Sequence, residues 1–153
     1  MSRAATGDDL IMAKTMSTAE WREFVSSGTH TGKAAVTGAD GTPHVTPIWF
    51  LLDGDDLVFN TAESSMKGRA LRRDPRICVC VDDDTPPFSF VSLWGRATLS
   101  TDVDEVRRWA TRLGGRYMGA EHAEEYGARN GVPGEYLVRV RIEKVVAVRD
   151  IAD

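Results

Sequence analysis

Apolar and polar residues alternate along much of this chain, and short clusters of Asp, Gly and Pro interrupt the alternation. A period of two is typical of strands with one buried face, and Asp-Gly pairs are typical of the turns that join such strands. Ala39-Asp40-Gly41 and the DGDD sequence at 53–56 are two such turns. The pattern predicts six strands, at residues 33–37, 43–52, 57–61, 76–81, 88–99 and 135–148.

Four shorter stretches have features of helices rather than strands. Ser17 and Glu20 have the spacing of a capping box, which begins the first helix. Pro75 ends the second helix, because proline disfavours helical backbone at the residue before it. The third has an apolar stripe, which we expect to serve only for packing and which consists of Val103, Val106, Ala110 and Leu113. We expect Gly114 and Gly115 to separate this helix from a polar fourth helix. The predicted helices are at 18–26, 65–73, 102–113 and about 120–128.

The connections between these elements favour an antiparallel barrel. Most of the predicted strands are joined by hairpins, and the regular strand–helix alternation of a doubly wound fold is missing. Six antiparallel strands with short connections favour closure, because closure removes exposed edges. We therefore predict a mainly β protein, a six-stranded antiparallel barrel with peripheral helices. A chain of 153 residues is long enough for one such domain, which we expect to span 17–153 after a flexible leader at 1–16.

Charge and composition narrow the class of function. The formal net charge of -4 argues against a general nucleic-acid binder. No apolar run is long enough to span a bilayer, and the first residues lack the apolar core of a signal peptide, so we expect a cytoplasmic protein. Cys78 and Cys80 share one face of a predicted strand and the three histidines are scattered, so we predict no metal site. The sequence has no Ser-His-Asp spacing and no G-x-S-x-G motif, so no catalytic side chain is named.

The basic helix that directly follows the third predicted strand is the most informative stretch. It begins with Ser64 and Ser65 and has Lys67 and Arg69 in its first turns. The free amides and the dipole of a helix N-terminus favour an anion, and cations there supply the counter-charge. The stretch predicts a site for a phosphorylated small molecule. The alternative is that Lys67 and Arg69 are solvated charges on a helix surface.

Pro47 lies in the middle of the predicted second strand. Proline cannot donate a ladder hydrogen bond, so this position predicts an edge, a bulge, or a place where a ligand approaches the backbone. Trp49 lies on the same strand face, where it is either part of the core or a wall of the site.

Together these segments resemble the split β-barrel flavin and deazaflavin oxidoreductases of the pyridoxamine 5'-phosphate oxidase-like superfamily. The resemblance rests on GxPHVxPIWF at 41–50, LVFNT at 57–61 and KGRxLxxDP at 67–75. The last segment and the small size are most similar to the branch that uses coenzyme F420, a deazaflavin. The resemblance implies an FMN-binding-like split barrel and a homodimer with two cofactor sites at the subunit interface. The final residues VVAVRDIAD lack the Trp- and Arg-rich segment that holds pyridoxal phosphate in the oxidase proper, so we expect no vitamin B6 chemistry.

The resemblance also implies which residues bind the cofactor. The phosphate and its linker would be met by Lys67, Ser65, Arg69, Asn60 and Thr61. The tricyclic ring would lie along the strand that contains Thr46, Pro47, Ile48 and Trp49. Aromatic side chains from the second subunit, Phe88 and Phe90, would complete the site. Three further cations, Arg72, Arg73 and Arg76, either guide the anionic polyglutamate tail of coenzyme F420 or are favourable charges at a helix C-terminus.

The implied function is hydride transfer between reduced coenzyme F420 and a small conjugated organic acceptor. The cofactor carries such a reaction, and the protein supplies orientation and excludes water, which fits a chain without an activated nucleophile. The implied partners are a second copy of the chain and a small-molecule substrate. Two alternatives stay open. One is an FMN-binding enzyme, such as a flavin reductase, on the same fold. The other is a non-catalytic barrel that stores a cofactor or binds heme or another ligand.

Overall fold

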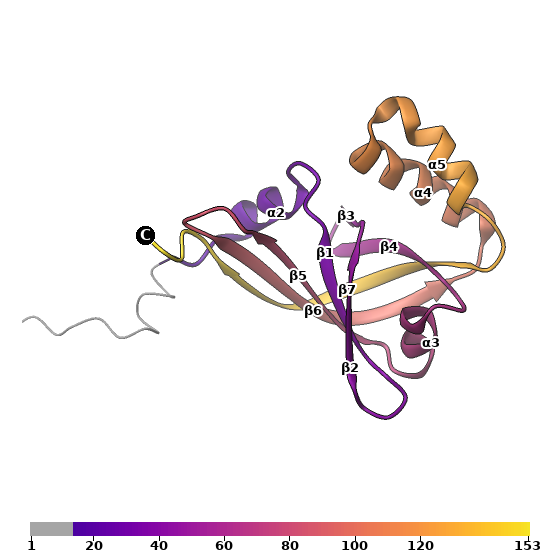
Figure 1. The fold of residues 1–153 in the computed structure, drawn as a ribbon, viewed down its shortest axis with the longest axis horizontal. Coiled ribbons are helices and arrows are strands. Elements are labelled where there is room, and N and C mark those ends of the chain that lie inside the picture. The colour runs from indigo at the N-terminus through magenta and orange to yellow at the C-terminus, as the bar shows by residue number, and fades with distance from the viewer. Residues whose placement is uncertain (1–13) are drawn as a thin grey trace, which may run out of the picture.

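The computed structural model describes residues 14–153. The fold is mainly an antiparallel β-sheet with a few helices, as predicted from the sequence (Figure 1). The strands are β1 (Gly32–Thr37), β2 (Pro43–Ile48), β3 (Leu51–Asp53), β4 (Asp56–Ala62), β5 (Arg76–Asp83), β6 (Ser89–Ser100) and β7 (Glu135–Val148). The helices are α2 (Thr18–Ser26), α3 (Met66–Arg73), α4 (Val103–Met118), the short 3-10 helix η1 (Ala120–His122) and α5 (Ala123–Asn130).

The seven strands form one sheet in the order β2-β1-β5-β6-β7-β4-β3. β2 and β3 therefore stand at opposite ends of the strand order, although only Trp49 and Phe50 separate them in sequence. Two residues of extended chain span only about 7 Å, so the sheet has to curl until its two edges approach each other. No ladder joins β2 to β3 among residues 14–153, so the barrel is split rather than closed.

The predicted count of six strands is wrong, because the stretch predicted as one strand at 43–52 divides into β2 and β3. Its apolar pattern runs on without interruption, which is why the sequence gives no sign of the division. Phe50, in the connection, is completely buried. Its backbone groups are bonded by side chains of α4 rather than by a neighbouring strand.

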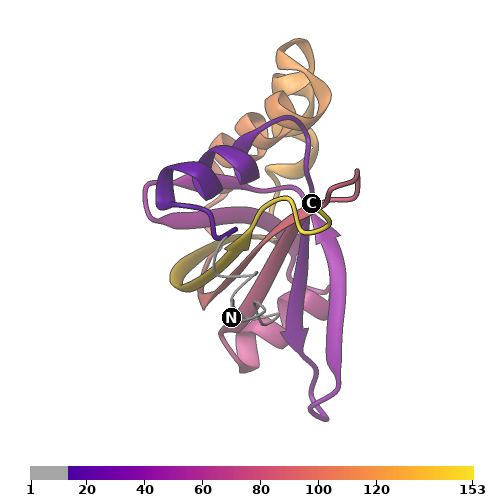
Figure 2. The ribbon, with the colours of Figure 1, turned by 90° about the vertical axis from the view of Figure 1, so that its left-hand side faces the viewer.

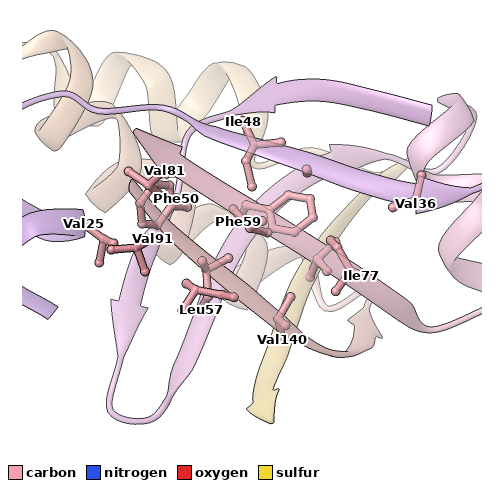
Figure 3. Close-up of a cluster of buried hydrophobic side chains, with 14 of the residues drawn as sticks. Val25, Val36, Ile48, Phe50, Leu57, Phe59, Ile77, Val81, Val91 and Val140 are labelled. Atoms are coloured by element: carbon pink, nitrogen blue, oxygen red, sulfur yellow. The ribbon is translucent and has the colours of Figure 1, made fainter. Parts of the chain in front are cut away.

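The core fills the inside of the curled sheet. The inward-facing residues of all the longer strands meet there, and Val25 of α2 joins them at one end (Figure 3). Phe50, Leu57 and Phe59 are among its largest completely buried side chains. Phe50 thus packs on the same core as the strands on either side of it, which holds the split between β2 and β3 in place.

The helices lie at the margins of the sheet. α3 packs on β1 and β4, whereas α4 and α5 form a separate hairpin, and α4 packs on β4 and β7 (Figures 1 and 2). The predicted helix break at Gly114 and Gly115 is wrong, because α4 continues to Met118. A Cβ atom on Gly114 would lie 2.5 Å from the Cβ of Tyr126 in α5. Gly114 therefore lets the two helices approach closely and does not end the first.

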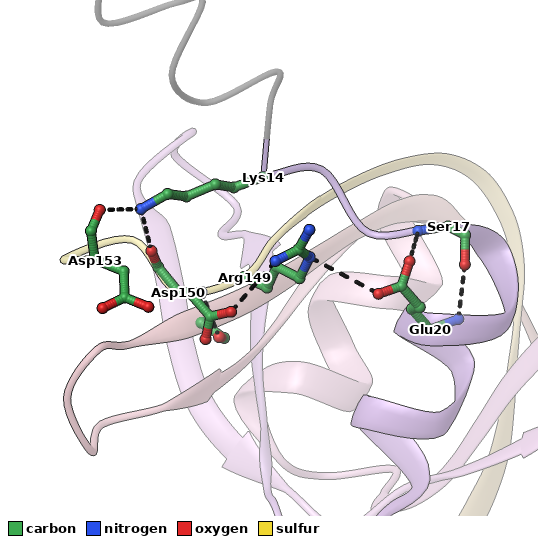
Figure 4. A network of polar contacts seen from close by, with 7 residues as sticks. Lys14, Ser17, Glu20, Arg149, Asp150 and Asp153 are labelled. Carbon is green, nitrogen blue, oxygen red and sulfur yellow. Dashed lines mark hydrogen bonds and ion pairs between the residues drawn. The ribbon is translucent and has the colours of Figure 1, made fainter.

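The two ends of the described chain are joined by polar contacts (Figure 4). The ammonium of Lys14 donates to the carbonyl oxygens of Asp150, at 2.6 Å, and of Asp153. Met16 is buried, and its amide donates to the carbonyl oxygen of Ala147 at 2.9 Å. Residues 14–16, which we expected in the leader, are therefore packed on β7. The rest of the predicted leader, residues 1–13, lies outside the described residues. No helix in the described part of the chain is long and apolar enough to cross a membrane.

Candidate functional site

A pocket of about 180 Å³ lies between the end of β2, the start of α3 and the α4–α5 hairpin. It brings together five of the residues that the sequence predicts for the site, Pro47, Ile48, Trp49, Asn60 and Lys67. Its other lining residues come from α4 and α5 and are Ala110, Leu113 and Asn130. We call this space the Lys67 pocket.

Lys67 provides the positive charge of the pocket. Its ammonium donates to the hydroxyl of Thr46 at 2.6 Å, which places another predicted site residue beside it. No carboxylate pairs with Lys67 in the described part of the chain. Partial burial lowers the pKa of this ammonium. An ammonium has three protons, so Lys67 keeps donors available for an anion in the pocket.

Ser65 and Thr61 hold the start of α3 in place. The hydroxyl of Ser65 accepts from the amide of Gly68 at 2.9 Å, donates to the carbonyl oxygen of Ala62 at 2.7 Å, and lies 3.0 Å from the hydroxyl of Thr61. Both hydroxyls thus belong to the N-terminal cap of the helix that carries Lys67. Neither lines the Lys67 pocket, and their direct contact with a phosphate stays a prediction.

Asn60 gives the pocket an acceptor without a partner. Its amide nitrogen donates to the carbonyl oxygen of Val106 at 3.4 Å, which is a long hydrogen bond. Its amide oxygen is buried and has no partner among the described residues. Buried acceptors are rarely left unpaired, so this oxygen is an unsatisfied polar group in the wall of the pocket.

Trp49 closes one side of the pocket from the connection between β2 and β3. Its ring stacks on Tyr117 of α4, with the centroids 5.1 Å apart and the planes 4° apart. Tyr126 of α5 packs on it at a tilt, 5.6 Å away. Pro47 lies on β2, the edge strand of the sheet, which confirms one of the three interpretations of that proline.

The contribution of the α4–α5 hairpin to the site was not predicted from the sequence. Ala110 and Leu113 were predicted only as a packing stripe, and both do belong to the buried side of α4. Asn130 is the last residue of α5, in a stretch with no recognisable motif. A polar side chain at the end of a short helix was the one available signal, and it is weak.

Arg69 lies outside the Lys67 pocket, in a separate groove of about 600 Å³ between α3 and the β1–β2 hairpin. Arg73 and His44 line the same groove. Arg72 and Arg76, which were also predicted to guide the cofactor tail, do not line this groove. Arg72 is exposed and lines neither cavity, and Arg76 pairs with Asp74 at 2.6 Å.

Phe88 and Phe90 do not line the Lys67 pocket within one chain. Phe88 is 41% exposed, has a positive φ of 65°, and lies in the turn between β5 and β6. That turn is at the opposite end of the molecule from α3 (Figure 1). The predicted contact of these rings with the cofactor, from a second copy of the chain, stays a prediction.

The sequence profile of the family described as Pyridoxamine 5'-phosphate oxidase matches residues 17–149. The chain belongs to this family. It is 25% identical over 124 residues to the F420H(2)-dependent biliverdin reductase of Mycobacterium tuberculosis (strain CDC 1551 / Oshkosh), a match that covers 81% of this chain and 83% of the relative. The family predicted from the sequence is thus confirmed, with a relative from its F420 branch.

Solved structures agree with this membership. The conserved hypothetical protein Rv2991 from Mycobacterium tuberculosis superposes with a TM-score of 0.78 at 28% identity, covering 92% of this chain and 90% of that one. A structure titled F420 Reductase superposes with a TM-score of 0.66 at 23% identity, covering 80% of this chain and 94% of that one. The second likeness shows a shared fold.

Proposed function

We propose that this chain is an oxidoreductase that binds reduced coenzyme F420 and delivers a hydride to a small conjugated organic acceptor. The observation that carries the proposal is the half-buried ammonium of Lys67, which has no carboxylate partner in the described residues and faces a pocket walled by Pro47, Ile48 and Trp49. The relative named for F420H(2) supports the choice of cofactor.

The residues of the Lys67 pocket fit a deazaflavin. Lys67 would hold the phosphate through charge-assisted hydrogen bonds. Asn60, which lines the pocket and has an unpartnered amide oxygen, would hydrogen-bond a polar edge of the ligand. The apolar walls formed by Ile48, Ala110 and Leu113 would exclude water from the ring. When bound, coenzyme F420 supplies the hydride, so the protein needs no nucleophile of its own.

The groove beyond α3 fits the anionic extension of the same cofactor. Arg69 and Arg73 line it, and neither pairs with a carboxylate among the described residues. The helix that carries them also carries Lys67. We therefore assign the predicted tail contact to Arg73 and add Arg69. We do not assign Arg76 to this contact, because its guanidinium pairs with Asp74 at 2.6 Å.

We further propose that a second copy of the chain completes the site. Small-molecule pockets usually exceed about 300 Å³, whereas the Lys67 pocket holds about 180 Å³. The outer face of the sheet also has an apolar cross-strand row, in which Val45, Ala35, Cys78 and Trp94 are paired neighbours on β2, β1, β5 and β6. Val45 is 63% exposed and Trp94 is 38% exposed. Burial against a second copy would cover this row and bring Phe88 of that copy toward the pocket.

Sedimentation velocity tests the homodimer. We expect the wild-type protein to sediment as a dimer and Val45→Lys to sediment as a monomer with weakened cofactor binding. Val132→Lys is the matched control, because Val132 is also an exposed valine, 39% accessible, but lies between α5 and β7. A monomeric wild-type protein that still binds cofactor tightly would refute the shared site.

Titration of the apoprotein with coenzyme F420 and, separately, with FMN tests the cofactor. We expect saturable fluorescence changes with coenzyme F420 and much weaker binding of FMN. Tight binding of FMN instead would place the protein among flavin enzymes, since the Lys67 phosphate contact serves either cofactor. Binding of coenzyme F420 without reduction of any acceptor would support the non-catalytic alternative.

A further inference from the structure

The backbone N–H and C=O groups of Phe50 are hydrogen-bonded by side chains of α4. Phe50 lies between β2 and β3 and is completely buried, so neither strand ladder satisfies its backbone groups. The guanidinium of Arg116 donates to the carbonyl oxygen of Phe50 at 2.7 Å, and also to those of Val25 at 2.7 Å and Gly28 at 3.1 Å. One planar side chain thus joins the split in the barrel to the end of α2, a task that suits the several fixed donors of arginine.

Tyr117, the next residue of α4, bonds the backbone amide of the same residue, Phe50. Its hydroxyl accepts from the amide of Phe50 at 3.2 Å and donates to the carbonyl oxygen of His30 at 2.8 Å. A hydroxyl has one proton to donate, so both of its roles are filled by these two backbone groups. Burial raises the pKa of Tyr117, which keeps the phenol neutral in this arrangement.

The ring of Tyr117 acts on the neighbouring residue, Trp49. The two rings are 5.1 Å apart and nearly parallel, at 4°. Tyr117 does not line the Lys67 pocket, whereas Trp49 does. The hydroxyl of Tyr117 therefore fixes the backbone on one side of Trp49, and its ring fixes the plane of the indole.

We infer that Tyr117 and Arg116 are positioning residues for the Lys67 pocket. They hold the connection between β2 and β3 in the one conformation in which Pro47, Ile48 and Trp49 all line the Lys67 pocket. The inference rests on the proposed function only for the identity of the planar ligand that this surface receives. The orientation of Trp49 itself is a property of the free protein.

The test compares Tyr117→Phe with Tyr126→Phe in protein that contains 5-fluorotryptophan. The chain has four tryptophans, and Trp49→Phe assigns the signal of Trp49 in the fluorine spectrum. Tyr117→Phe should shift or broaden that signal in the free protein and leave those of buried Trp21 and Trp109 in place. Tyr126→Phe is the matched control, because Tyr126 also packs on Trp49 but its hydroxyl has no hydrogen bond among the described residues.

Titration with coenzyme F420 then shows whether the effect passes through Trp49. Tyr117→Phe should raise the Kd roughly tenfold, the scale of one lost hydrogen bond, and should change it less than about twofold when Trp49 is already Phe. Equal effects in both backgrounds, or an unmoved Trp49 signal, would overturn the positioning role. If circular dichroism shows that Tyr117→Phe does not fold, Arg116→Lys replaces it in the same cycle. A wild-type protein that binds no coenzyme F420 refutes the proposed function, while the fluorine spectra still decide the positioning.

Discussion

Replacement of Lys67 by alanine tests the central contact of the proposed site. In the free protein the ammonium has one hydrogen bond, to Thr46, and no carboxylate partner among the described residues. A phosphate in the pocket would therefore meet a cation whose charge is not already neutralised. Loss of a charged hydrogen bond usually costs about 1–3 kcal/mol, which corresponds to a roughly 5- to 150-fold increase in Kd. We expect Lys67→Ala to weaken coenzyme F420 binding within that range.

The same substitution should leave the free protein folded. Burial lowers the pKa of Lys67 and no ion pair offsets the cost of that burial, so the cation opposes folding slightly. The melting temperature of the free Lys67→Ala variant should therefore equal or exceed that of the wild type. Arg72→Ala is the control, because Arg72 is on the same helix and is exposed outside both cavities. If Lys67→Ala and Arg72→Ala bind the cofactor equally well, the assignment of Lys67 to the phosphate is wrong.

The pH dependence gives a second measure of the Lys67 contact. The folded-state pKa of Lys67 is below the ordinary 10.5, so between the two values the unfolded chain holds a proton that the folded chain has released. Stability of the free protein therefore gains a contribution from Lys67 as the pH rises through this window. Cofactor binding should change in the opposite direction, because the neutral amine attracts a phosphate less. Lys67→Arg should bind with no such alkaline loss, and titrations across this pH range check both signs.

Three further predictions concern the framework of the site. Gly68→Ala should lower stability by about 1–3 kcal/mol, because its Cβ would lie 2.3 Å from the carbonyl oxygen of Ala62, and chemical denaturation measures the loss. A Cβ atom on Gly115 would lie 3.5 Å from the Cβ of Ala123, which is an ordinary contact. Because alanine is more favourable than glycine inside a helix, Gly115→Ala should stabilise the protein by about 0.5–1 kcal/mol in the same assay. The hydrogen bonds from Arg76 lower the pKa of Asp74 to about 2, so its stabilising effect should fade as the pH falls from 3.8 toward 2, and Asp74→Asn should remove that part of an acid-unfolding curve.

The parts of the fold that were predicted correctly depend on local chemistry. The first helix begins at the Ser17 capping box, in which the amide of Glu20 donates to the Ser17 hydroxyl and the amide of Ser17 donates to the Glu20 carboxylate. The basic helix begins after Ser65 and ends before Pro75 as expected. Each of these signals depends only on residues a few positions apart, so the local sequence is enough to predict where the helix begins or ends.

The parts that were missed depend on residues far apart in the sequence. The division of the strand at Trp49 and Phe50 requires Arg116 and Tyr117, which lie more than sixty residues away. The continuation of α4 through Gly114 requires Tyr126 on the next helix. Neither partner can be identified from local pattern, because both depend on where the α4–α5 hairpin packs.

The candidate site was predicted in part for the same reason. Pro47, Ile48, Trp49, Asn60 and Lys67 come from one continuous segment that has family motifs, and they do meet in one pocket. Arg69 was placed beside Lys67 because the two are close in sequence, yet they face different cavities on either side of α3. A helical spacing of two residues turns side chains about 200° apart, which separates them to opposite faces.

The split between β2 and β3 has a consequence for the order of folding. The β1–β2 and β3–β4 hairpins each require only local contacts and can form early. The Lys67 pocket, however, exists only once β7 has paired with both β6 and β4 and has brought the two hairpins to opposite edges of one curled sheet. No hairpin on its own presents the whole pocket. A cofactor that needs the whole pocket would therefore slow unfolding of the finished barrel and leave its rate of folding unchanged.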